Sequence, residues 1–308
     1  MENVLIIGSG PAALTAALYT ARANLSPLVI EGIDAGGQLM TTTEVENYPG
    51  FHDGVMGPDL IENMRKQAEK FGARFVSGNV SKVQFKELPL TAHTDDNAYT
   101  AKTVIISTGA RPKKLDIESE KRLWGYGISS CATCDGAFFR GKEVCVIGGG
   151  DSALEEALFL TRFASKVTII HRRDELRASK IMQDRAFANK KIAFLWDSLV
   201  DEYLASDKNL LRGVNVRNVK TNVITEYPCD GVFLGIGHIP NTDIFKGQID
   251  LDENGYIITR EPRTHTNIEG VFAAGDAVDH IYRQAITAAA MGCKSAIDAE
   301  RYLSEMNM

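Results

Sequence analysis

The chain has 308 residues, which is enough for two domains that each bury a core. Hydrophobic and charged fractions of 44% and 24% are ordinary for a globular protein, and the formal net charge of −6 argues against a dedicated nucleic-acid surface. No apolar run approaches the length of a membrane span, and the first strand begins at Val4, so we expect neither a signal peptide nor a membrane span. Five cysteines with one tight pair do not suit a secreted disulfide framework, so we expect a cytoplasmic protein.

A short apolar strand at 4–7 leads into a glycine-rich turn and then a helical run. The turn at 8–13 reads Gly-Ser-Gly-Pro-Ala-Ala, which matches the G-x-G-x-x-A fingerprint of dinucleotide-binding folds. Its glycines permit a tight turn and a close approach to a pyrophosphate, whose charge the helix amides bind. A second strand at 27–30 ends at Glu31, and a carboxylate there suits a ribose 2′-OH and repels a 2′-phosphate. We therefore expect FAD or NAD in this unit, and not NADP.

The next part of the chain, up to residue 112, carries weaker signals. The run at 36–39, Gly-Gly-Gln-Leu, is compatible with a flexible turn or a ligand loop. A helix is predicted at 57–72, and short alternating strands at 74–99 predict a small antiparallel sheet. A buried strand at 103–106 follows, and Arg111-Pro112 is predicted to break it and to mark an exit from the domain.

Cys131 and Cys134 are two residues apart and are followed directly by Asp135. This spacing favours a redox couple in an intracellular protein. A neighbouring carboxyl group can supply the proton transfer that thiol–disulfide exchange requires. The alternative is a zinc knuckle, which needs four ligands, whereas the other cysteines lie far apart in the sequence. We therefore predict a redox pair.

The dinucleotide fingerprint recurs just downstream of the cysteines. A strand at 144–147 leads into Gly-Gly-Gly-Asp-Ser-Ala at 148–153 and a helical run. The next strand, at 167–170, ends in His171-Arg172-Arg173, with Arg177 close by. Guanidinium groups match a phosphate in charge and geometry, so this unit is predicted to prefer NADPH. A solvated basic turn is the alternative.

The C-terminal part contains one more apolar strand, which ends in Gly275-Asp276, and a long helix of small apolar residues. The helical spacing predicts a packed face and makes Cys293, like Cys145, a core thiol. A helix N-terminus aimed at a flavin would stabilise the negative charge of the reduced ring. The predicted face comprises Ala285, Ala289, Ala290, Cys293, Ala296 and Ile297.

Taken together, these motifs resemble those of the low-molecular-weight, bacterial-type thioredoxin reductases over nearly the whole chain. The motifs that carry the resemblance are those at 131–135, 148–153, 171–173, 275–276 and 282–285. The resemblance implies an α/β fold with two Rossmann-like domains, each with a parallel sheet plus a small antiparallel sheet. It also implies a homodimer with FAD in each subunit.

The resemblance also implies a domain order and a reaction. The FAD-binding domain would comprise 1–112 and 241–308, and the NADPH-binding domain, 113–240, would carry the redox cysteines. NADPH would reduce FAD, FAD would reduce the Cys131–Cys134 disulfide, and the dithiol would reduce oxidised thioredoxin. The alternative is a nucleotide-binding redox sensor without turnover, but the complete set of electron-path residues favours the enzyme.

The implied site contains catalytic, FAD-binding and NADPH-binding residues, and no metal. The catalytic residues are Cys131, Cys134 and Asp135. The expected FAD contacts are Gly8, Ser9, Gly10, Pro11, Ala12, Glu31, Gly32, Ile33, Asp34, Ala35, Gly36, Gly37, Gln38, Leu39, Asn47, Val80, Thr108, Gly109, Gly275, Asp276, Arg283, Gln284 and Ala285. The expected NADPH contacts are Gly148, Gly150, Asp151, Ser152, Ala153, His171, Arg172, Arg173 and Arg177. One departure is Ala13, where the family usually has glycine, which questions how closely that helix approaches its strand.

Overall fold

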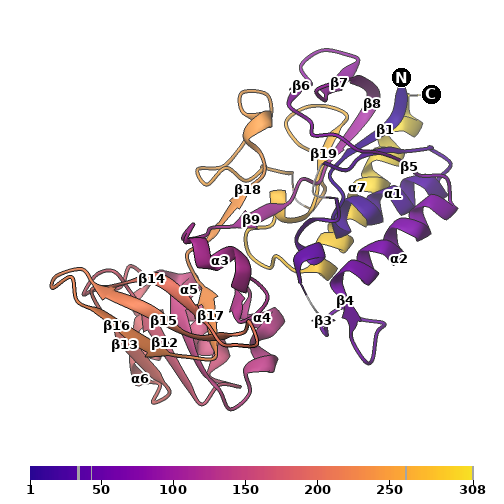
Figure 1. Cartoon of the computed structure of the whole chain (residues 1–308). Coiled ribbons are helices and arrows are strands. Elements are labelled where there is room, and N and C mark those ends of the chain that lie inside the picture. Colours follow the sequence, from indigo (N-terminus) through magenta and orange to yellow (C-terminus); the bar gives the residue numbers. More distant parts are fainter. Residues whose placement is uncertain (33–34, 43, 261, 307–308) are drawn as a thin grey trace. The chain divides into compact units, whose positions relative to one another are not determined.

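The computed structural model describes residues 1–32, 35–42, 44–260 and 262–306. The chain forms two compact units: the first comprises Met1–Arg111 and Ile239–Met308, and the second comprises Pro112–His238. The chain passes between the units in β9 (Ala110–Pro112) and β18 (His238–Pro240), which pair as a two-stranded sheet (Figure 1). Strand β8 has already ended at Ile106, so Arg111 and Pro112 lie in a separate strand, and the boundary between the two compact units falls between these two residues.

The first unit contains a seven-stranded sheet in which parallel strands and an antiparallel extension share one long strand. Its strands are β1 (Glu2–Ile7), β2 (Leu28–Ile30), β5 (Arg74–Val76), β6 (Lys82–Gln84), β7 (Leu90–His93), β8 (Ala98–Ile106) and β19 (Val271–Ala273). The first part of β8 pairs antiparallel with β7, and its last three residues pair in parallel with β19. The sequence pattern predicts an antiparallel arrangement for all of 74–99, but β5 pairs in parallel with β2.

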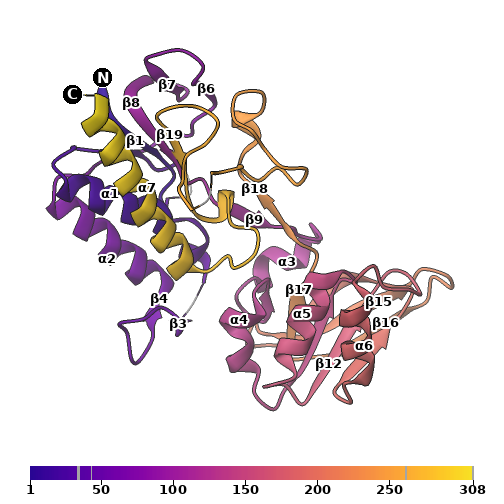
Figure 2. The ribbon, with the colours of Figure 1, turned by 180° about the vertical axis from the view of Figure 1, so that it is seen from behind.

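Three helices pack on one face of this sheet: α1 (Pro11–Arg22), α2 (Gly57–Lys70) and α7 (Ala285–Met306). Helix α1 lies beside both α2 and α7 (Figures 1 and 2). Helices α1 and α7 approach so closely at Gly292 that a Cβ on this glycine would overlap the carbonyl of Ala12. On the opposite face, side chains of the parallel strands and of β6 and β7 form a second hydrophobic core with the segment around Phe245.

The buried face of α7 differs from the predicted one. Its buried residues are Ala288, Ala289, Gly292, Ser295, Ala296, Asp298, Ala299 and Leu303. Ala290 and Ile297 are exposed and Cys293 is only half-buried, so their assignment to the core is wrong. Cys145, the other predicted core thiol, is fully buried, as predicted.

The second unit has three layers, and the middle layer is a five-stranded parallel sheet in the order β10-β17-β11-β12-β13. The strands are β10 (Ile128–Ser129), β11 (Glu143–Ile147), β12 (Lys166–Ile170), β13 (Ile192–Leu195) and β17 (Gly231–Leu234). Helices α5 (Asp151–Leu160) and α6 (Lys180–Ala188) pack on one face. The other face packs against α3 (Glu118–Leu123) and an antiparallel sheet of β14 (Ser198–Ala205), β15 (Leu211–Asn218) and β16 (Ile224–Pro228).

The α/β fold predicted from the sequence is confirmed, since each unit combines a parallel sheet with antiparallel strands. The assignment of FAD to one unit and NADPH to the other stays a prediction.

The remaining elements are β3 (Glu44–Val45), β4 (Val55–Met56), α4 (Ala132–Asp135) and the 3₁₀ turns Gly37–Thr41, Gly136–Phe139, Asp243–Phe245 and Gly275–Ala277. Within the described ranges, none of the helices is both long and apolar enough to cross a bilayer.

Candidate active site

Cys131 and Cys134 are joined by a disulfide, with their Cα atoms 5.3 Å apart. Cys131 caps the short helix α4, and the backbone N–H of Cys134 lies 3.2 Å from the Cys131 sulfur to which it donates. The backbone N–H of Cys131 donates to the Ser129 hydroxyl oxygen at 3.0 Å. The two sulfurs that the spacing pairs therefore sit in one compact turn at the start of α4.

Asp135 is the residue next to this disulfide that can hold a proton. Its side chain is partly buried, and burial raises the pKa of its carboxyl group above the ordinary value, while a hydrogen bond with Ser129 opposes this shift. A raised pKa keeps a larger fraction of the carboxyl protonated toward neutral pH. Asp135 can therefore give a proton to a thiolate as the disulfide opens and take it back later.

The first glycine turn has the shape that a bound pyrophosphate requires. Gly8 has a φ of +122°, and a Cβ on it would overlap the carbonyl of Ser107. Beside Gly10, in contrast, none of the described residues apart from its two chain neighbours has an atom within 4 Å of the place where a Cβ would stand. The space next to the backbone at Gly10, just before α1, is thus open to a ligand.

A hydroxyl group links this turn to the segment that follows β2. Ser9 Oγ donates to the carbonyl of Glu31 at 2.7 Å and accepts from the N–H of Gly36 at 2.9 Å. The buried carboxylate of Glu31 forms an ion pair with Arg65 of α2. Arg65 also lies 4.3 Å from the Phe75 ring centroid and pairs with Glu69. Sequence reasoning missed Arg65, because a basic residue on the polar face of a helix carries no signal of its partner.

Asp276 provides an independent test of whether a flavin nucleotide fits the first unit. Its buried Oδ1 has no hydrogen-bond partner among the residues that the structure describes. Burial raises the pKa of this carboxyl group to about 7, the charge of Asp279 adds to the shift, and Arg283 opposes it. An enclosed oxygen without a donor is costly, and a ligand hydroxyl would satisfy it. FAD has such hydroxyl groups, so the residues present fit this cofactor.

The structure brings several other predicted FAD contacts together. Asn47 Nδ2 donates to Gln284 Oε1 at 3.2 Å, across 237 positions of sequence. Gly37 lies against Gly10, and Gly275 lies against Ala12 of α1. Asp279, which lies within the segment from Asp276 to Ala285 that the resemblance assigns to FAD, accepts hydrogen bonds from three consecutive backbone N–H groups at 281–283 and so shapes the approach to α7.

Other predicted contacts lie beside this group or are not placed. Gln38 Nε2 donates to the carbonyl of Ala110 at 2.8 Å. Thr108 Oγ1 donates to the carbonyl of Asn241, also at 2.8 Å. Val80 packs against the hydrophobic core of the first unit. Ile33 and Asp34 lie outside the described residues. The FAD contacts as a set stay a prediction.

The second glycine turn repeats this design. Gly148 has a φ of +147°, and none of the described residues apart from its two chain neighbours comes within 4 Å of the place where a Cβ on Gly150 would stand. A Cβ on Gly149 would overlap the imidazole ring of His171. His171 is buried, with Nε2 3.0 Å from the carbonyl oxygen of Glu175. Burial lowers the pKa of His171, the hydrogen bond with the Glu175 carbonyl opposes this shift, and the neighbouring arginines lower the pKa further, so the neutral ring is favoured.

The loop at 171–179, here called the arginine loop, is bonded to the second glycine turn. The carbonyl of Gly149 accepts hydrogen bonds from the N–H groups of Arg177 and Ala178, at 2.7 and 3.2 Å. Asp151 Oδ1 accepts from the N–H and the hydroxyl of Ser179, at 2.9 and 2.7 Å. These bonds fix the C-terminal end of the loop beside the start of α5.

The three arginines of this loop, Arg172, Arg173 and Arg177, are exposed. None of the ion pairs in the described part of the chain involves them. Their guanidinium groups are therefore available to an anion from solution. Glu31, at the corresponding position of the first unit, is buried in an ion pair, so the two glycine turns carry opposite charge beside them.

Two glycine turns and a redox disulfide in one chain define a flavin- and pyridine-nucleotide-dependent oxidoreductase. The pyridine nucleotide-disulphide oxidoreductase family matches residues 2–292, and the chain belongs to this family. It is 56% identical to a thioredoxin reductase from Streptomyces coelicolor over 100% of this chain and 95% of that protein. It is 54% identical to a thioredoxin reductase from Rickettsia conorii over 98% of each chain.

Solved structures that resemble this chain are also thioredoxin reductases. The chain resembles the crystal structure of thioredoxin reductase from Streptococcus pyogenes with a TM-score of 0.94 and 45% identity, covering 99% of each chain. Thioredoxin reductase from Giardia duodenalis gives a TM-score of 0.92 and 42% identity over 98% of each chain. The predicted family, the predicted cofactors FAD and NADPH and the predicted oxidoreductase class are confirmed by these relatives.

Proposed function

We propose that this chain is a thioredoxin-disulfide reductase that passes two electrons from NADPH through FAD to the Cys131–Cys134 disulfide and then to oxidised thioredoxin. The observation that carries the proposal is the Cys131–Cys134 disulfide in a chain that also holds two glycine turns. The side chains beside these turns have opposite charge, with Glu31 in the first unit and Arg172 and Arg173 in the second. High identity to thioredoxin reductases along the whole chain supports the same substrate.

In this proposal the first unit binds FAD, which supplies hydride acceptance and two-electron transfer to the disulfide. The open side of Gly10 receives the pyrophosphate, Glu31 accepts from a ribose hydroxyl, and Asp276 accepts a hydrogen bond from a flavin-chain hydroxyl. In the second unit Gly150 faces the pyrophosphate of NADPH, and Arg172 and Arg173 bind its 2′-phosphate.

The residues of the disulfide turn perform the thiol chemistry. Two electrons break the Cys131–Cys134 bond and leave a thiolate and, after protonation by Asp135, a thiol. One sulfur then attacks the thioredoxin disulfide and forms a mixed disulfide, and the departing thioredoxin sulfur takes up a proton. The second sulfur attacks the mixed disulfide, which restores the Cys131–Cys134 bond and releases thioredoxin as a dithiol.

We also propose a homodimer in the cytoplasm. The resemblance to bacterial-type thioredoxin reductases supports the dimer, and the pattern of cysteines supports the compartment. Light scattering of the purified protein would give the mass of a 33.7 kDa chain or twice that mass. A single-chain mass at micromolar concentration would contradict the dimer.

The function is tested by following the visible absorbance of the bound flavin. Addition of NADPH should bleach it, and addition of oxidised thioredoxin should restore it. Cys134→Ser is the matched control, because it retains the nucleotide sites: NADPH should still bleach the flavin, but thioredoxin should not restore the absorbance. A redox sensor would show bleaching without turnover by the parent protein.

A further inference from the structure

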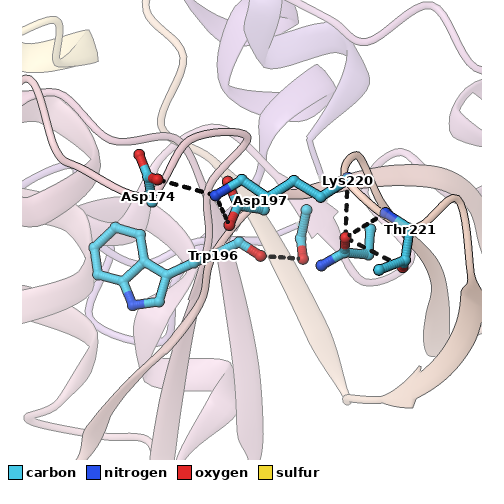
Figure 3. Close-up of polar contacts among 7 residues, drawn as sticks. Asp174, Trp196, Asp197, Lys220 and Thr221 are labelled. Atoms are coloured by element: carbon cyan, nitrogen blue, oxygen red, sulfur yellow. Dashed lines mark hydrogen bonds and ion pairs between the residues drawn. The ribbon is translucent and has the colours of Figure 1, made fainter.

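Lys220 bridges two carboxylates next to the arginine loop (Figure 3). It lies in the turn between β15 and β16, and its Nζ is 2.9 Å from Asp174 Oδ2 and 2.8 Å from Asp197 Oδ2. Asp174 directly follows Arg173, one of the arginines expected to bind the 2′-phosphate. A lysine from a distant hairpin thus holds the N-terminal half of the arginine loop.

The turn that carries Lys220 is itself held in place. Asn218 Oδ1 accepts hydrogen bonds from the N–H of Lys220 at 3.0 Å, the N–H of Thr221 at 3.0 Å and the hydroxyl of Thr221 at 3.3 Å (Figure 3). This side chain fixes the backbone from which Lys220 extends. Less conformational entropy is then lost when Lys220 meets its two acidic partners.

Backbone hydrogen bonds run through the same contact. The N–H of Val219 donates to the carbonyl of Asp197 at 2.7 Å, and the N–H of Asp197 donates to the carbonyl of Arg173 at 3.2 Å. Asp197 has a φ of +50°, a left-handed conformation that is costly for a residue other than glycine. The hairpin turn, Asp197 and Arg173 therefore form one connected chain of bonds.

Lys220 also balances charge beside the arginines. Asp197 is mostly enclosed, with 17% of its side chain exposed, whereas Asp174 is 69% exposed. Without Lys220 both carboxylates would lose their cationic partner, and their charge would attract the arginine side chains and repel a 2′-phosphate. The C-terminal end of the arginine loop is already held by Gly149 and Asp151. Lys220 adds a side-chain anchor in the N-terminal half of the loop, at Asp174.

We propose that Lys220 is a positioning residue that gives this protein part of its preference for NADPH over NADH, by holding Asp174 and Asp197 away from the arginines. The inference rests on the proposed NADPH site and extends it to a residue that itself needs no contact with the nucleotide. It assigns the β15–β16 turn a role in nucleotide selectivity, through the residues that it holds.

Binding of two probe nucleotides to the flavin-loaded protein tests this proposal. Titration calorimetry with 2′,5′-ADP, which carries the 2′-phosphate, is compared with 5′-AMP, which lacks it. Lys220→Met should weaken binding of 2′,5′-ADP about three- to tenfold, as expected for two partly exposed ion pairs, and leave 5′-AMP within twofold. The KM for NADPH should rise by the same factor while kcat stays unchanged.

Three further variants distinguish positioning from a general effect of charge. Lys220→Arg keeps the cation and should retain nearly parental binding. Lys220→Met combined with Asp174→Asn should recover part of the affinity, since one uncompensated carboxylate is removed. Lys208→Met removes the same charge from the exposed turn between β14 and β15 of the same antiparallel sheet and should change neither probe.

Each result has a defined meaning. Equal weakening of both probes by Lys220→Met, or the same effect in Lys208→Met, would overturn the positioning role. Should Lys220→Met fold poorly, Asp174→Asn tests the same bridge, because it removes one of the two carboxylates that Lys220 holds. An unchanged ratio of the two dissociation constants in Asp174→Asn, together with weaker binding of 2′,5′-ADP to Lys220→Arg, would overturn the positioning role. A parent protein with no preference for 2′,5′-ADP would instead refute the proposed NADPH site itself.

Discussion

Gly149 faces the imidazole ring of His171 so closely that any side chain at position 149 would overlap the ring. The middle glycine of the second turn is therefore required by packing, whereas Gly150 is required by the space that it leaves. His171 lies at the start of the arginine loop, and Gly149 accepts two hydrogen bonds from its other end. The glycine turn and the arginine loop are thus built as one unit.

This relationship predicts that alanine substitutions at these two neighbouring glycines affect different properties, stability at Gly149 and NADPH binding at Gly150. Gly149→Ala should lower the free energy of unfolding by about 1–3 kcal/mol, because the buried His171 must move. Gly150→Ala should leave stability nearly unchanged but raise the KM for NADPH, because its Cβ enters the space meant for the pyrophosphate. Urea unfolding and steady-state kinetics measure the two effects. Equal destabilisation by both variants would contradict the assignment.

The arginines of the arginine loop should decide which nucleotide is used. A charge-assisted contact to phosphate contributes roughly 1.5–3 kcal/mol, so Arg172→Ala with Arg173→Ala should raise the KM for NADPH by about ten- to a hundredfold or more. The KM for NADH, which lacks the 2′-phosphate, should barely change, and the FAD content should stay the same. The measurement is the ratio of catalytic efficiencies for the two nucleotides. An unchanged ratio would make these arginines a solvated turn.

Asp135 should control the thiol steps without affecting reduction of the flavin. Asp135→Asn should slow thioredoxin reduction by about a hundredfold or more, because the group that exchanges a proton with the thiolate is lost. In the parent, burial raises the pKa of Asp135 above its ordinary value, so the proton-donating form persists to a higher pH than in an exposed aspartate and is lost as the pH rises. This limb of the pH profile should be missing in the variant. Rapid-mixing kinetics with NADPH and with thioredoxin separate the two half-reactions.

Asp276 should make the flavin-free protein less stable as the pH rises. Its pKa is raised to about 7 in the folded state, so between the ordinary value near 3.8 and about 7 the folded protein holds a proton that the unfolded chain releases. Stability from this group is therefore complete at low pH and is lost as the pH approaches 7, by up to about 1.4 kcal/mol per pH unit. Asp276→Asn carries no charge and should be more stable than the parent at pH 8, but not at pH 4.5. Urea unfolding of both proteins at the two pH values tests this, and an equal difference at both would contradict it.

Local features of the chain could be predicted well. The two glycine turns follow strands and precede helices, so the backbone conformation at Gly8 and Gly148 depends mainly on neighbouring residues. The disulfide between Cys131 and Cys134 is also local, because two intervening residues bring the sulfurs within reach in a single turn. Charge at the end of a strand, as at Glu31 and Arg172, needs only the strand and the turn to be recognised.

Contacts between distant segments could not be predicted in this way. The pairs Glu31–Arg65 and Asn47–Gln284 join different elements, and each depends on how helices and loops pack. The exposure of Cys293 depends on which side of α7 meets α1, and periodicity alone cannot distinguish adjacent faces of a helix rich in alanine.

Lys220 shows the same division. Its sequence neighbours indicate only a polar turn, with Asn218 as a typical turn residue. The packing of the antiparallel sheet on the parallel sheet brings that turn to the arginine loop, 46 positions away from Asp174. Short-range sterics and hydrogen bonding thus determine the turns and the disulfide from nearby residues, whereas side-chain packing between layers selects which distant charges meet.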